Sequence, residues 1–292
     1  MKITNKMGLP KSFVEMATRD YEYKPKQYSV TSLLKGVRET ILQRRYHHEI
    51  EEDVADMIWM LWGQAVHHIL EQQPEEDCEL KEEYLKVHIT DGYYLTGLFD
   101  LYNNEEGKVT DYKTASVWKV IHDDFKEWRK QLLIYCWMMR KSGFEANKGE
   151  VVAILKDHSK SKAERDKDYP QHPVFKKAWE FTDYEFEEIE EWILDKFLEI
   201  KKAEEMPDNE LPICTPEERW AEPETFAVKK KGRKSALRVL NSYEDAEDWM
   251  QNTGKGEYIE HRPGKDKKCP NYCSVAEFCD YYQEQLREVE VG

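Results

Sequence analysis

The fold of this chain is decided by two short stretches, Thr96-Gly97-Leu98-Phe99-Asp100 and Val109-Thr110-Asp111-Tyr112-Lys113. Apolar residues occupy strand positions in both stretches, and the Asn-containing turn between them ends at Gly107, as is common in hairpin loops. We therefore predict a β-hairpin whose strands hold Asp100 and Asp111 side by side. Asp111 and Lys113 are two residues apart, so the period of a strand directs both side chains to the same face.

Two carboxylates and an amine on one face suit the hydrolysis of phosphodiesters. Carboxylates held close together repel each other unless a divalent cation lies between them, and hard oxygen ligands favour Mg²⁺ or Mn²⁺. Such a cation can acidify a water molecule, orient the phosphate and neutralise charge on its oxygens. Lys113 could then hold the attacking water or stabilise the crowded phosphorus centre. The alternative is a solvated hairpin with a surface ion pair worth little. Because D-x-K is short and common, both interpretations stay open on these residues alone.

Two segments beside the hairpin have the apolar pattern of helices. Residues 118–143 contain Gln131 and Tyr135, which lie one above the other on a helical face because they are four residues apart. Residues 50–73 contain Gly63-Gln64-Ala65-Val66-His67. A single histidine on such a helix is more often structural or exposed than a ligand, so His67 by itself indicates little.

Four short motifs follow one another along the chain: Gly63 to His67, Gly97 to Asp100, Asp111 to Lys113, and Gln131 to Tyr135. In this order and at these separations they resemble the PD-(D/E)XK nuclease superfamily, specifically its RecB-like exonuclease branch. The pattern of that branch is G-x-x-x-H on a helix, G-x-x-D, D-x-K, and Q-x-x-x-Y on the following helix. Four motifs in register are far more specific than any one of them, and the resemblance covers about residues 28–282.

The resemblance implies a role for each matching residue. The implied ligands of Mg²⁺ or Mn²⁺ are His67, Asp100, Asp111 and the backbone carbonyl of Tyr112. The implied catalytic residues are Asp100, Asp111, Lys113, Gln131 and Tyr135. Within this set Lys113 is the catalytic lysine, which assists the attacking water or the developing charge, and Gln131 and Tyr135 organise the site or contact DNA.

Six cysteines occur in the chain, at positions 78, 136, 214, 269, 273 and 279. No signal peptide is recognisable, and no apolar run approaches the roughly 20 residues of a membrane span. We therefore expect a cytoplasmic protein without a membrane partner, in which clustered cysteines more often bind metal than form disulfides. Cys269, Cys273 and Cys279 give the spacing C-x3-C-x5-C, and Cys214 is the candidate fourth ligand. Cys136 lies in an apolar helix, where a small buried hydrophobic residue is expected.

Some members of the RecB-like branch, among them AddB and the CRISPR-associated adaptation nucleases, have one distant cysteine and a C-terminal trio around a 4Fe-4S cluster. The resemblance therefore implies a 4Fe-4S cluster held by Cys214, Cys269, Cys273 and Cys279. The trio of those relatives is usually C-x2-C-x5-C, and their distant cysteine often precedes the nuclease core, whereas Cys214 follows it. Both departures leave structural Zn²⁺ open as the alternative, since four thiolates also suit zinc.

The 44 basic and 59 acidic residues give a formal net charge of −15, which is unexpected for a DNA-binding chain. A uniformly basic surface is excluded, so any contact with nucleic acid must be local. Candidate basic segments lie at 156–167, 229–234 and 265–268, although a run of charges is more often a solvated face. Much of the acidic surplus falls at 183–205, which has the pattern of a helix with Glu on its outer face.

At 292 residues the chain is long enough for a full core with appended elements. We expect a polar N-terminal arm at 1–27, a nuclease core at 28–205 and a C-terminal appendage at 206–292 that the cysteine cluster holds together. Strand patterns alternate with helical ones through the core, which indicates the α/β class with a central mixed β-sheet flanked by helices. The resemblance implies that this core is restriction-endonuclease-like.

The predicted function is that of a metal-dependent DNA exonuclease. It would hydrolyse phosphodiester bonds at single-stranded DNA ends, in phage or mobile-element recombination or DNA processing. One alternative is a processing nuclease of the CRISPR-adaptation type that acts only within a complex. Another is a non-catalytic DNA-end-binding module, against which the intact D-x-K and His67 argue, because a degenerate nuclease commonly loses its lysine. The predicted partner is DNA, and the sequence indicates no particular protein partner.

Overall fold

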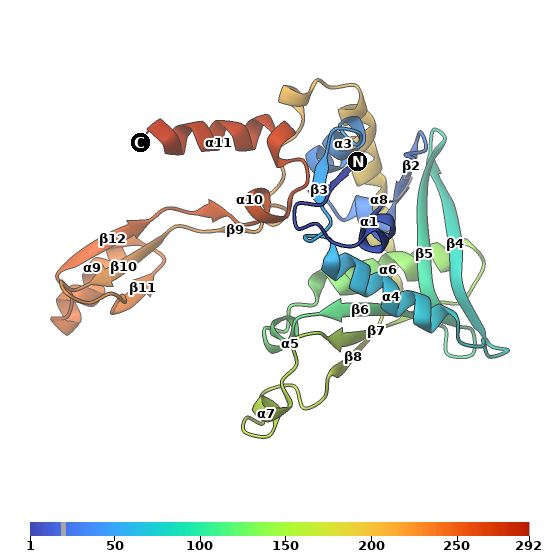
Figure 1. Cartoon of the computed structure of the whole chain (residues 1–292), viewed down its shortest axis with the longest axis horizontal. Coiled ribbons are helices and arrows are strands. Elements are labelled where there is room, and N and C mark those ends of the chain that lie inside the picture. The colour runs from blue at the N-terminus through green and yellow to red at the C-terminus, as the bar shows by residue number, and fades with distance from the viewer. Residues whose placement is uncertain (19–21, 292) are drawn as a thin grey trace. The chain divides into compact units, whose positions relative to one another are not determined.

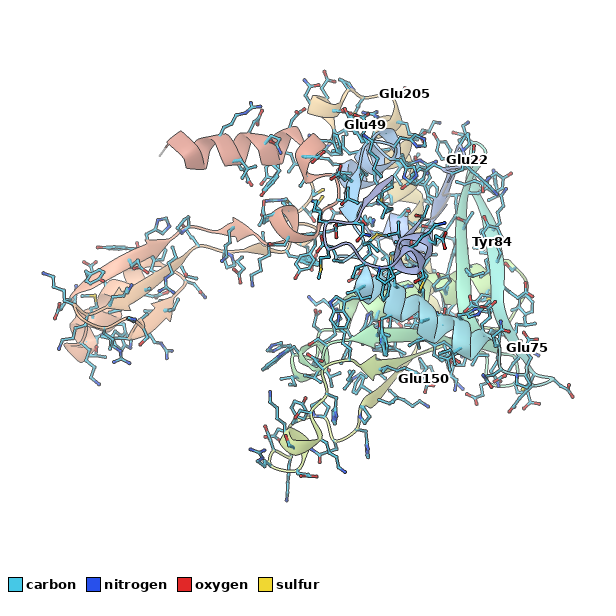
Figure 2. The ribbon with its side chains drawn as sticks, viewed as in Figure 1. Glu22, Glu49, Glu75, Tyr84, Glu150 and Glu205 are labelled. Atoms are coloured by element: carbon cyan, nitrogen blue, oxygen red, sulfur yellow. The ribbon has the colours of Figure 1, made fainter. Side chains whose placement is uncertain are left out.

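A computed structural model describes residues 1–18 and 22–291 of the chain. The chain divides into two compact units, residues 1–206 and residues 207–292. Figure 1 shows the helices and strands of both, coloured along the sequence, and Figure 2 adds the side chains. None of the helices in the described residues is long and apolar enough to cross a membrane.

A six-stranded mixed sheet forms the centre of the first unit. Its strands are β2 (Gln27–Ser29), β4 (Glu79–Thr90), β5 (Tyr93–Asn103), β6 (Lys108–Ala115), β7 (Lys148–Leu155) and β8 (Val174–Glu180). The pairs β4–β5, β5–β6 and β7–β8 are antiparallel, whereas β2–β5 and β6–β7 are parallel. The parallel pair β6–β7 is joined by a helical crossover, as parallel neighbours require. The predicted α/β class with a central mixed sheet is confirmed.

Strand β5 has different partners along its two edges. On one edge β4 pairs with it along nearly its whole length. On the other edge β2 pairs with residues 94–96, and β6 pairs with residues 101–103. Residues 97–100 lie between these two pairings, so the ladder between β5 and β6 ends next to Asp100. We call this point, where β5 and β6 separate, the fork of the sheet.

The predicted hairpin is formed by β5 and β6. Its paired residues are Leu101 with Thr110, Tyr102 with Val109, and Asn103 with Lys108. Continued by one position, this register sets Asp100 opposite Asp111, as the sequence predicts. The turn requires a glycine, because Gly107 has a φ of +60° and an added Cβ would lie 3.1 Å from the backbone oxygen of Glu145.

The helices that follow β2 in the first unit are α2 (Val30–Leu33), α3 (Val37–Arg45), α4 (Ile58–Glu71), α5 (Val117–Ile121), α6 (Lys126–Lys141), α7 (Lys160–Ala163) and α8 (Asp183–Glu204). Of these, α4 packs on β6, and α6 packs on β6, β7 and α8. Thr114 of β6 faces α4, whereas Lys113 contacts α6. Because successive residues of a strand point to opposite faces, α4 and α6 cover opposite faces of β6.

Two predicted helices have different limits in the structure. The predicted helix at 50–73 is shortened to α4, because residues 51–53 form β3, which pairs in parallel with β1 (Lys2–Thr4). The predicted helix at 118–143 is two helices, α5 and α6. Between them, Asp123 has a φ of +49°, which is outside the right-handed helical region.

The segment 1–27, predicted to be a polar arm, contributes β1 and the helix α1 (Lys11–Ala17) to the first unit. Ala17 is buried and packs with Val54, Met57 and Leu61. These contacts join the N-terminal segment to the start of α4, the helix that carries His67.

The second unit combines two small sheets with short helices. Its elements are η1 (Asp208–Glu210), β9 (Ala221–Glu222), β10 (Thr225–Lys229), β11 (Arg238–Leu240), α9 (Tyr243–Thr253), β12 (Tyr258–Arg262), β13 (Lys265–Asp266), α10 (Lys268–Tyr272), η2 (Ala276–Phe278) and α11 (Asp280–Val291). The strands β11, β10 and β12 form one antiparallel sheet, and β9 pairs with β13. The strands β10 and β11 are antiparallel, and the basic segment 229–234 lies at the end of β10 and in the connection to β11.

Candidate active site

The structure brings the predicted metal-binding and catalytic residues of the first unit together at the fork of the sheet. They come from four elements: His67 from α4, Asp100 from β5, Asp111, Tyr112 and Lys113 from β6, and Gln131 and Tyr135 from α6. Residues separated by more than sixty positions in the sequence thus share one site. Two glycines allow the helices to approach the strands closely enough for this.

Gly63 allows α4 to lie close to β6. A Cβ atom at this position would be 3.3 Å from Oγ1 of Thr114, closer than an ordinary van der Waals contact. About one turn further along the helix, Nε2 of His67 lies 3.0 Å from the backbone oxygen of Tyr112. The spacing from glycine to histidine therefore sets both the approach of the helix and the reach of the imidazole.

Gly97 allows α6 to lie close to β5. A Cβ atom there would be 2.6 Å from Cε1 of Tyr135 and 3.2 Å from Cγ2 of Val30. Any larger residue would displace the aromatic ring of Tyr135, which is buried and whose pKa is raised chiefly by that burial. This contact explains why Gly97 and Tyr135 occur together in the four-motif pattern, although they are distant in sequence.

His67 and Asp100 form a direct pair. Nδ1 of His67 lies 3.2 Å from Oδ1 of Asp100, and the backbone N–H of Tyr112 donates a hydrogen bond of 2.5 Å to the other carboxylate oxygen, Oδ2. The hydrogen bond with Asp100 raises the pKa of His67, and burial opposes this shift. Asp100 therefore closes the fork by joining α4 to β6 through its two oxygens.

Asp111, Lys113 and Gln131 form a second group on the face that α6 covers. Nζ of Lys113 donates to Oδ1 of Asp111 and to Oε1 of Gln131, at 3.0 Å each. Gln131 in turn donates through Nε2 to Oδ1 of Asp111, at 3.4 Å. Burial raises the pKa of Asp111, and the positive charge of Lys113 opposes this shift.

One oxygen of Asp111 is left without a hydrogen bond. Its Oδ2 lies 2.8 Å from Nζ of Lys113, but among the described residues no donor reaches it with hydrogen-bond geometry. A buried carboxylate oxygen without a donor is costly, because its hydration is lost and not replaced. Such an atom suits a cation, which binds oxygen without requiring a donor.

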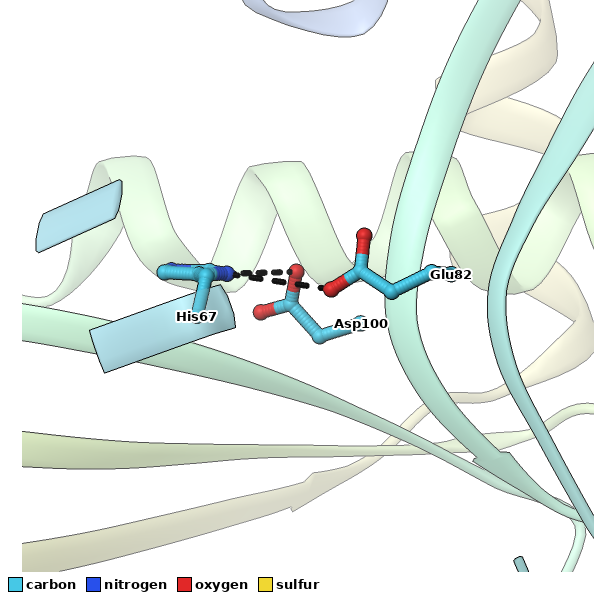
Figure 3. Close-up of side chains that lie close together, drawn as sticks. All are labelled: His67, Glu82 and Asp100. Atoms are coloured by element: carbon cyan, nitrogen blue, oxygen red, sulfur yellow. Dashed lines mark ion pairs between the residues drawn. The ribbon is translucent and has the colours of Figure 1, made fainter. Parts of the chain in front are cut away.

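Glu82 is a member of the site that the sequence does not predict. Its Oε1 lies 4.0 Å from Nδ1 of His67, and the nearest oxygens of Glu82 and Asp100 and the imidazole nitrogen lie within 4.8 Å of one another. Figure 3 shows the three side chains converging between α4 and the strands. Burial is the main cause that raises the pKa of Glu82, and the charge of Asp100 adds to it. The sequence around it, Glu79 to Glu83, is rich in charge, and no motif distinguishes Glu82 from its neighbours.

The donor set fits a divalent cation. It combines an imidazole, carboxylate oxygens and a backbone carbonyl. Mg²⁺ and Mn²⁺ both accept oxygen ligands, and the imidazole favours Mn²⁺. Glu82 and Asp100 lie near each other, and the charge of Asp100 acts on Asp111, which is in contact with the ammonium group of Lys113. A cation would remove the repulsion among these carboxylates and would satisfy Oδ2 of Asp111.

One protein family matches the chain over nearly its whole length. The sequence model of the PD-(D/E)XK nuclease superfamily matches residues 15–280. The chain belongs to this superfamily. Its mixed sheet flanked by helices is accordingly the restriction-endonuclease-like core of PD-(D/E)XK nucleases, and all four motifs lie within the matched residues. A search of curated proteins found no match.

Three solved structures share part of their arrangement with this PD-(D/E)XK chain. The structure of SSO0001 is 20% identical in sequence to this chain, and the alignment covers 64% of this chain and 82% of the SSO0001 chain, with a TM-score of 0.45. LHK-Exo in complex with dAMP is 14% identical, covering 59% and 91%, with a TM-score of 0.33. A phage-related exonuclease from Haemophilus somnus 129PT is 11% identical, covering 65% and 78%, with a TM-score of 0.27. At these identities and scores the three structures add no argument about activity.

Of the four cysteines predicted to form a cluster in the second unit of this PD-(D/E)XK protein, three lie close enough to Cys269 to act on it electrostatically. Cys269 is buried, and the charges of Cys273, Cys279 and Cys214 all act on it. Burial and these neighbours raise the pKa of the Cys269 thiol to about 12. Without a metal the Cys269 thiol therefore stays protonated, and a metal bound there would have to displace its proton. Cys136, by contrast, is buried within α6, as predicted for a core residue.

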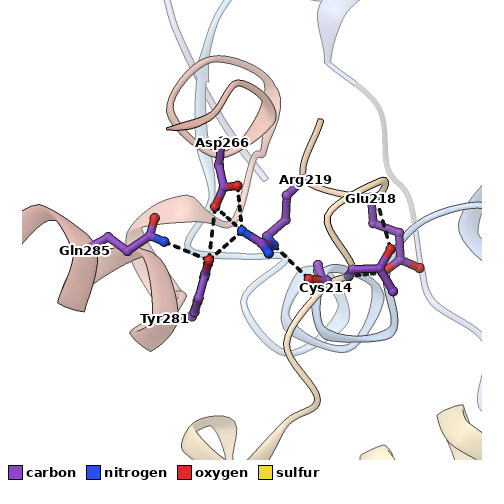
Figure 4. Close-up of polar contacts among 7 residues, drawn as sticks. Cys214, Glu218, Arg219, Asp266, Tyr281 and Gln285 are labelled. Atoms are coloured by element: carbon purple, nitrogen blue, oxygen red, sulfur yellow. Dashed lines mark hydrogen bonds and ion pairs between the residues drawn. The ribbon is translucent and has the colours of Figure 1, made fainter. Parts of the chain in front are cut away.

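Arg219 joins the segments that carry these cysteines. Its Nε donates a hydrogen bond of 2.8 Å to the backbone oxygen of Cys214. Its Nη1 donates hydrogen bonds to Asp266 and to the hydroxyl of Tyr281. Asp266 precedes Cys269 by three residues, and Tyr281 follows Cys279 by two. Figure 4 shows this network, which Gln285 extends by donating 2.7 Å to the Tyr281 hydroxyl. One guanidinium thus holds three separate parts of the cysteine site.

None of the predicted metal-binding or catalytic residues lies within the predicted basic segments. Residues 229–234 connect β10 to β11, and residues 156–167 surround α7. In the third segment, Lys265 and Lys267 pair with Glu222, which is the behaviour of a solvated charged face.

Proposed function

We propose that this protein is a metal-dependent DNA exonuclease that hydrolyses phosphodiester bonds at single-stranded ends. The observation that carries the proposal is the convergence of His67, Asp100 and Asp111 at the fork, with Lys113 in contact with the buried carboxylate. Superfamily membership supports nuclease chemistry. Phage or mobile-element DNA processing is the proposed setting.

Each residue has a proposed task at the phosphodiester. His67, Asp100, Asp111 and the carbonyl of Tyr112 would hold Mg²⁺ or Mn²⁺, which supplies charge to the phosphate oxygens and lowers the pKa of water. Lys113, which Asp111 and Gln131 orient, would stabilise the negative charge that develops at phosphorus. Gln131 and Tyr135 would position the strand or the residues that touch it.

Exposed tryptophans near the site support a single-stranded substrate. Trp59 and Trp62 lie on α4, the helix that carries His67, and their side chains are 58% and 53% exposed. Nζ of Lys156 lies 4.2 Å from the ring centroid of Trp59. Aromatic rings beside a lysine suit the bases and phosphates of an unpaired strand, because unpaired bases can stack on them.

The decisive experiment is digestion of end-labelled DNA in the presence of Mn²⁺. Linear single strands, linear duplexes and closed circular single strands would be compared for the wild-type protein. We expect linear single strands to be degraded and circles to persist, because an exonuclease requires an end. Cutting of the circles would show an endonuclease instead.

The same assay tests the proposed catalytic lysine. Lys113→Met keeps the aliphatic stem and removes the charge, and we expect it to lower the rate by at least about 100-fold. The matched control is Lys108→Met on the same strand, because Lys108 is similarly exposed and pairs with Glu106 and not with the site. Undiminished digestion by folded Lys113→Met would refute the catalytic assignment.

A 4Fe-4S cluster at Cys214, Cys269, Cys273 and Cys279 is the second part of the proposal. The electrostatic effect of Cys214, Cys273 and Cys279 on Cys269 supports a shared metal or cluster. Visible absorbance and iron content of anaerobically purified protein would distinguish a cluster from Zn²⁺. A colourless protein with one zinc per chain would favour the zinc alternative.

A further inference from the structure

We propose that Glu82 is an additional metal ligand, so that this site binds two divalent cations that share Asp100. One cation would be held by Asp100, Asp111 and the carbonyl of Tyr112. The other would be held by His67, Glu82 and Asp100. This inference rests on the proposed metal-dependent function and assigns a role to a residue outside the four sequence motifs.

The position of Glu82 follows from the pairing of β4 with β5. Lys81 pairs with Leu101, and Glu83 pairs with Phe99, so the register sets Glu82 opposite Asp100. Residues directly opposite each other in an antiparallel pair have their side chains on the same face. The carboxylate of Glu82 is therefore presented to the site by the sheet itself.

The backbone and surroundings of Glu82 are unusual for a strand residue. Its φ is +49°, in the left-handed region that non-glycine residues rarely adopt. Its side chain is 18% exposed, and its Oε1 lies 4.0 Å from Nδ1 of His67, too far for a hydrogen bond. A carboxylate that is mostly buried beside Asp100 and His67, with its nearest imidazole nitrogen 4.0 Å away, suits coordination to a cation.

The arrangement of donors separates two groups that share one residue. The side chain of Asp111 is 9% exposed, and its Oδ2 has no hydrogen-bond donor among the described residues. This oxygen lies 2.8 Å from Nζ of Lys113 and suits an added cation on the side of β6. The group formed by His67, Glu82 and Asp100 is a different set, and its three ligand atoms lie within 4.8 Å of one another. Asp100 belongs to both groups because it lies between α4 and β6.

Two cations sharing a carboxylate would divide the work of phosphodiester hydrolysis. In sites with two metal ions, one ion stabilises the attacking oxygen and the other the leaving oxygen. The cation held by His67, Glu82 and Asp100 would have one imidazole nitrogen among its ligands, which favours Mn²⁺ over Mg²⁺. Glu82 would therefore influence which metal supports the activity.

The test counts Mn²⁺ ions bound to the full-length protein without DNA. Wild-type protein, Glu82→Gln and Asp111→Asn would be titrated with Mn²⁺, and the free ion measured by electron paramagnetic resonance. The matched control is Glu83→Gln, because Glu83 is the next residue of β4 and is exposed. The four cysteines are present in all of these proteins, so any binding there cancels in the comparison.

We expect two Mn²⁺ ions on the wild-type protein and on Glu83→Gln. Glu82→Gln should bind one of them at least about tenfold more weakly and keep the other, since loss of even an outer hydrogen-bond partner costs 10–100-fold in metal affinity. Glu82→Asp, which keeps the charge, should bind more tightly than Glu82→Gln. Melting curves would establish that each variant is folded.

Two results would overturn the inference: a single Mn²⁺ on the wild-type protein, or equal binding by Glu82→Gln and Glu83→Gln. Either result is distinguishable from failure of the proposed function. If the wild-type protein digests DNA with Mn²⁺ and Lys113→Met does not, the function holds while the role of Glu82 falls. If the wild-type protein binds no Mn²⁺ and digests nothing, both fall.

Discussion

Replacement of Gly97 by alanine is the sharpest structural test of the site, because it adds one methyl group at a known contact. The new Cβ would lie 2.6 Å from Cε1 of Tyr135 and 3.2 Å from Cγ2 of Val30. The first distance is shorter than any that real Cβ atoms adopt. The ring of Tyr135 therefore has to move, and it is enclosed within the core, with 5% of its surface exposed.

The size of the effect follows from two opposing contributions. Overpacking a well-packed core costs about 1–3 kcal/mol of unfolding free energy. Alanine also restricts the unfolded chain, which returns about 0.4–1 kcal/mol because the φ of Gly97 is not positive. We expect a net loss of about 1–2 kcal/mol. For a folded unit of 206 residues this lowers the melting temperature by about 2–8 °C.

A double-mutant cycle assigns this loss to the ring. Urea unfolding would be measured for Gly97→Ala, Tyr135→Ala and the double variant, and the interaction energy calculated from the four proteins. Without the ring, the added methyl group has space, so Gly97→Ala should cost much less in the Tyr135→Ala background. Tyr135→Phe is the control, since it keeps the ring and should leave the cost unchanged.

The reasoning is refuted if Gly97→Ala is as stable as the wild-type protein. It is also refuted if the cost is the same with and without the Tyr135 ring. Activity provides a second readout, because displacement of this ring should disturb Gln131 on the preceding turn of α6 and lower the rate of digestion.

Three further predictions concern protons, DNA and the second unit. Mn²⁺ affinity should rise with pH, because the pKa values of His67 and Asp111 are raised and the metal must displace the protons that these groups retain to a higher pH than usual. Calorimetry in two buffers would detect the release of these protons. An Mn²⁺ affinity that does not change between pH 6 and pH 8 would contradict this prediction. Trp62→Ala should weaken binding of single-stranded DNA by about 1–3 kcal/mol without changing Mn²⁺ affinity, as measured by fluorescence anisotropy in Ca²⁺. Arg219→Gln should destabilise the second unit by about 3 kcal/mol, because it leaves Asp266 buried without its partner; unchanged hydrogen exchange there would oppose this.

The part of the site that the sequence predicts is the part that rests on regular periodicities. Asp111 and Lys113 share a face because a strand repeats every two residues, and the hairpin turn fixes which residue lies opposite Asp100. The spacing of four between Gln131 and Tyr135 gives one helical face in the same way. In each case a local rule is enough, and the structure has the predicted elements.

Element limits were less predictable where tertiary contacts compete with local pattern. Residues 51–53 lie within an apolar, helix-like segment, yet they form β3 because the distant strand β1 supplies backbone hydrogen bonds to them. The break between α5 and α6 depends on the left-handed backbone of Asp123. Neither partner pairing nor such a conformation follows from the periodicity of apolar residues.

Glu82 shows most clearly what no motif contains. It is one acidic residue in a charged strand, and only the register of β4 with β5 brings it opposite Asp100. Pairing between strands depends on contacts across the sheet, so its consequences for a single side chain appear only after the sheet is formed. A residue without a fixed spacing to the other ligands cannot be recognised from spacing.

The sequence by itself determined the superfamily of this protein, through the order of its glycine, histidine, aspartate, lysine, glutamine and tyrosine motifs, and it placed four cysteines beyond them. Those features are local, since helix and strand periods decide which side chains share a face. The tertiary structure alone decided the fork between β5 and β6, the Tyr135 ring over Gly97, and the presence of Glu82 at the site. These depend on the approach of segments far apart in the chain, which is set by packing and strand pairing and not by any local repeat.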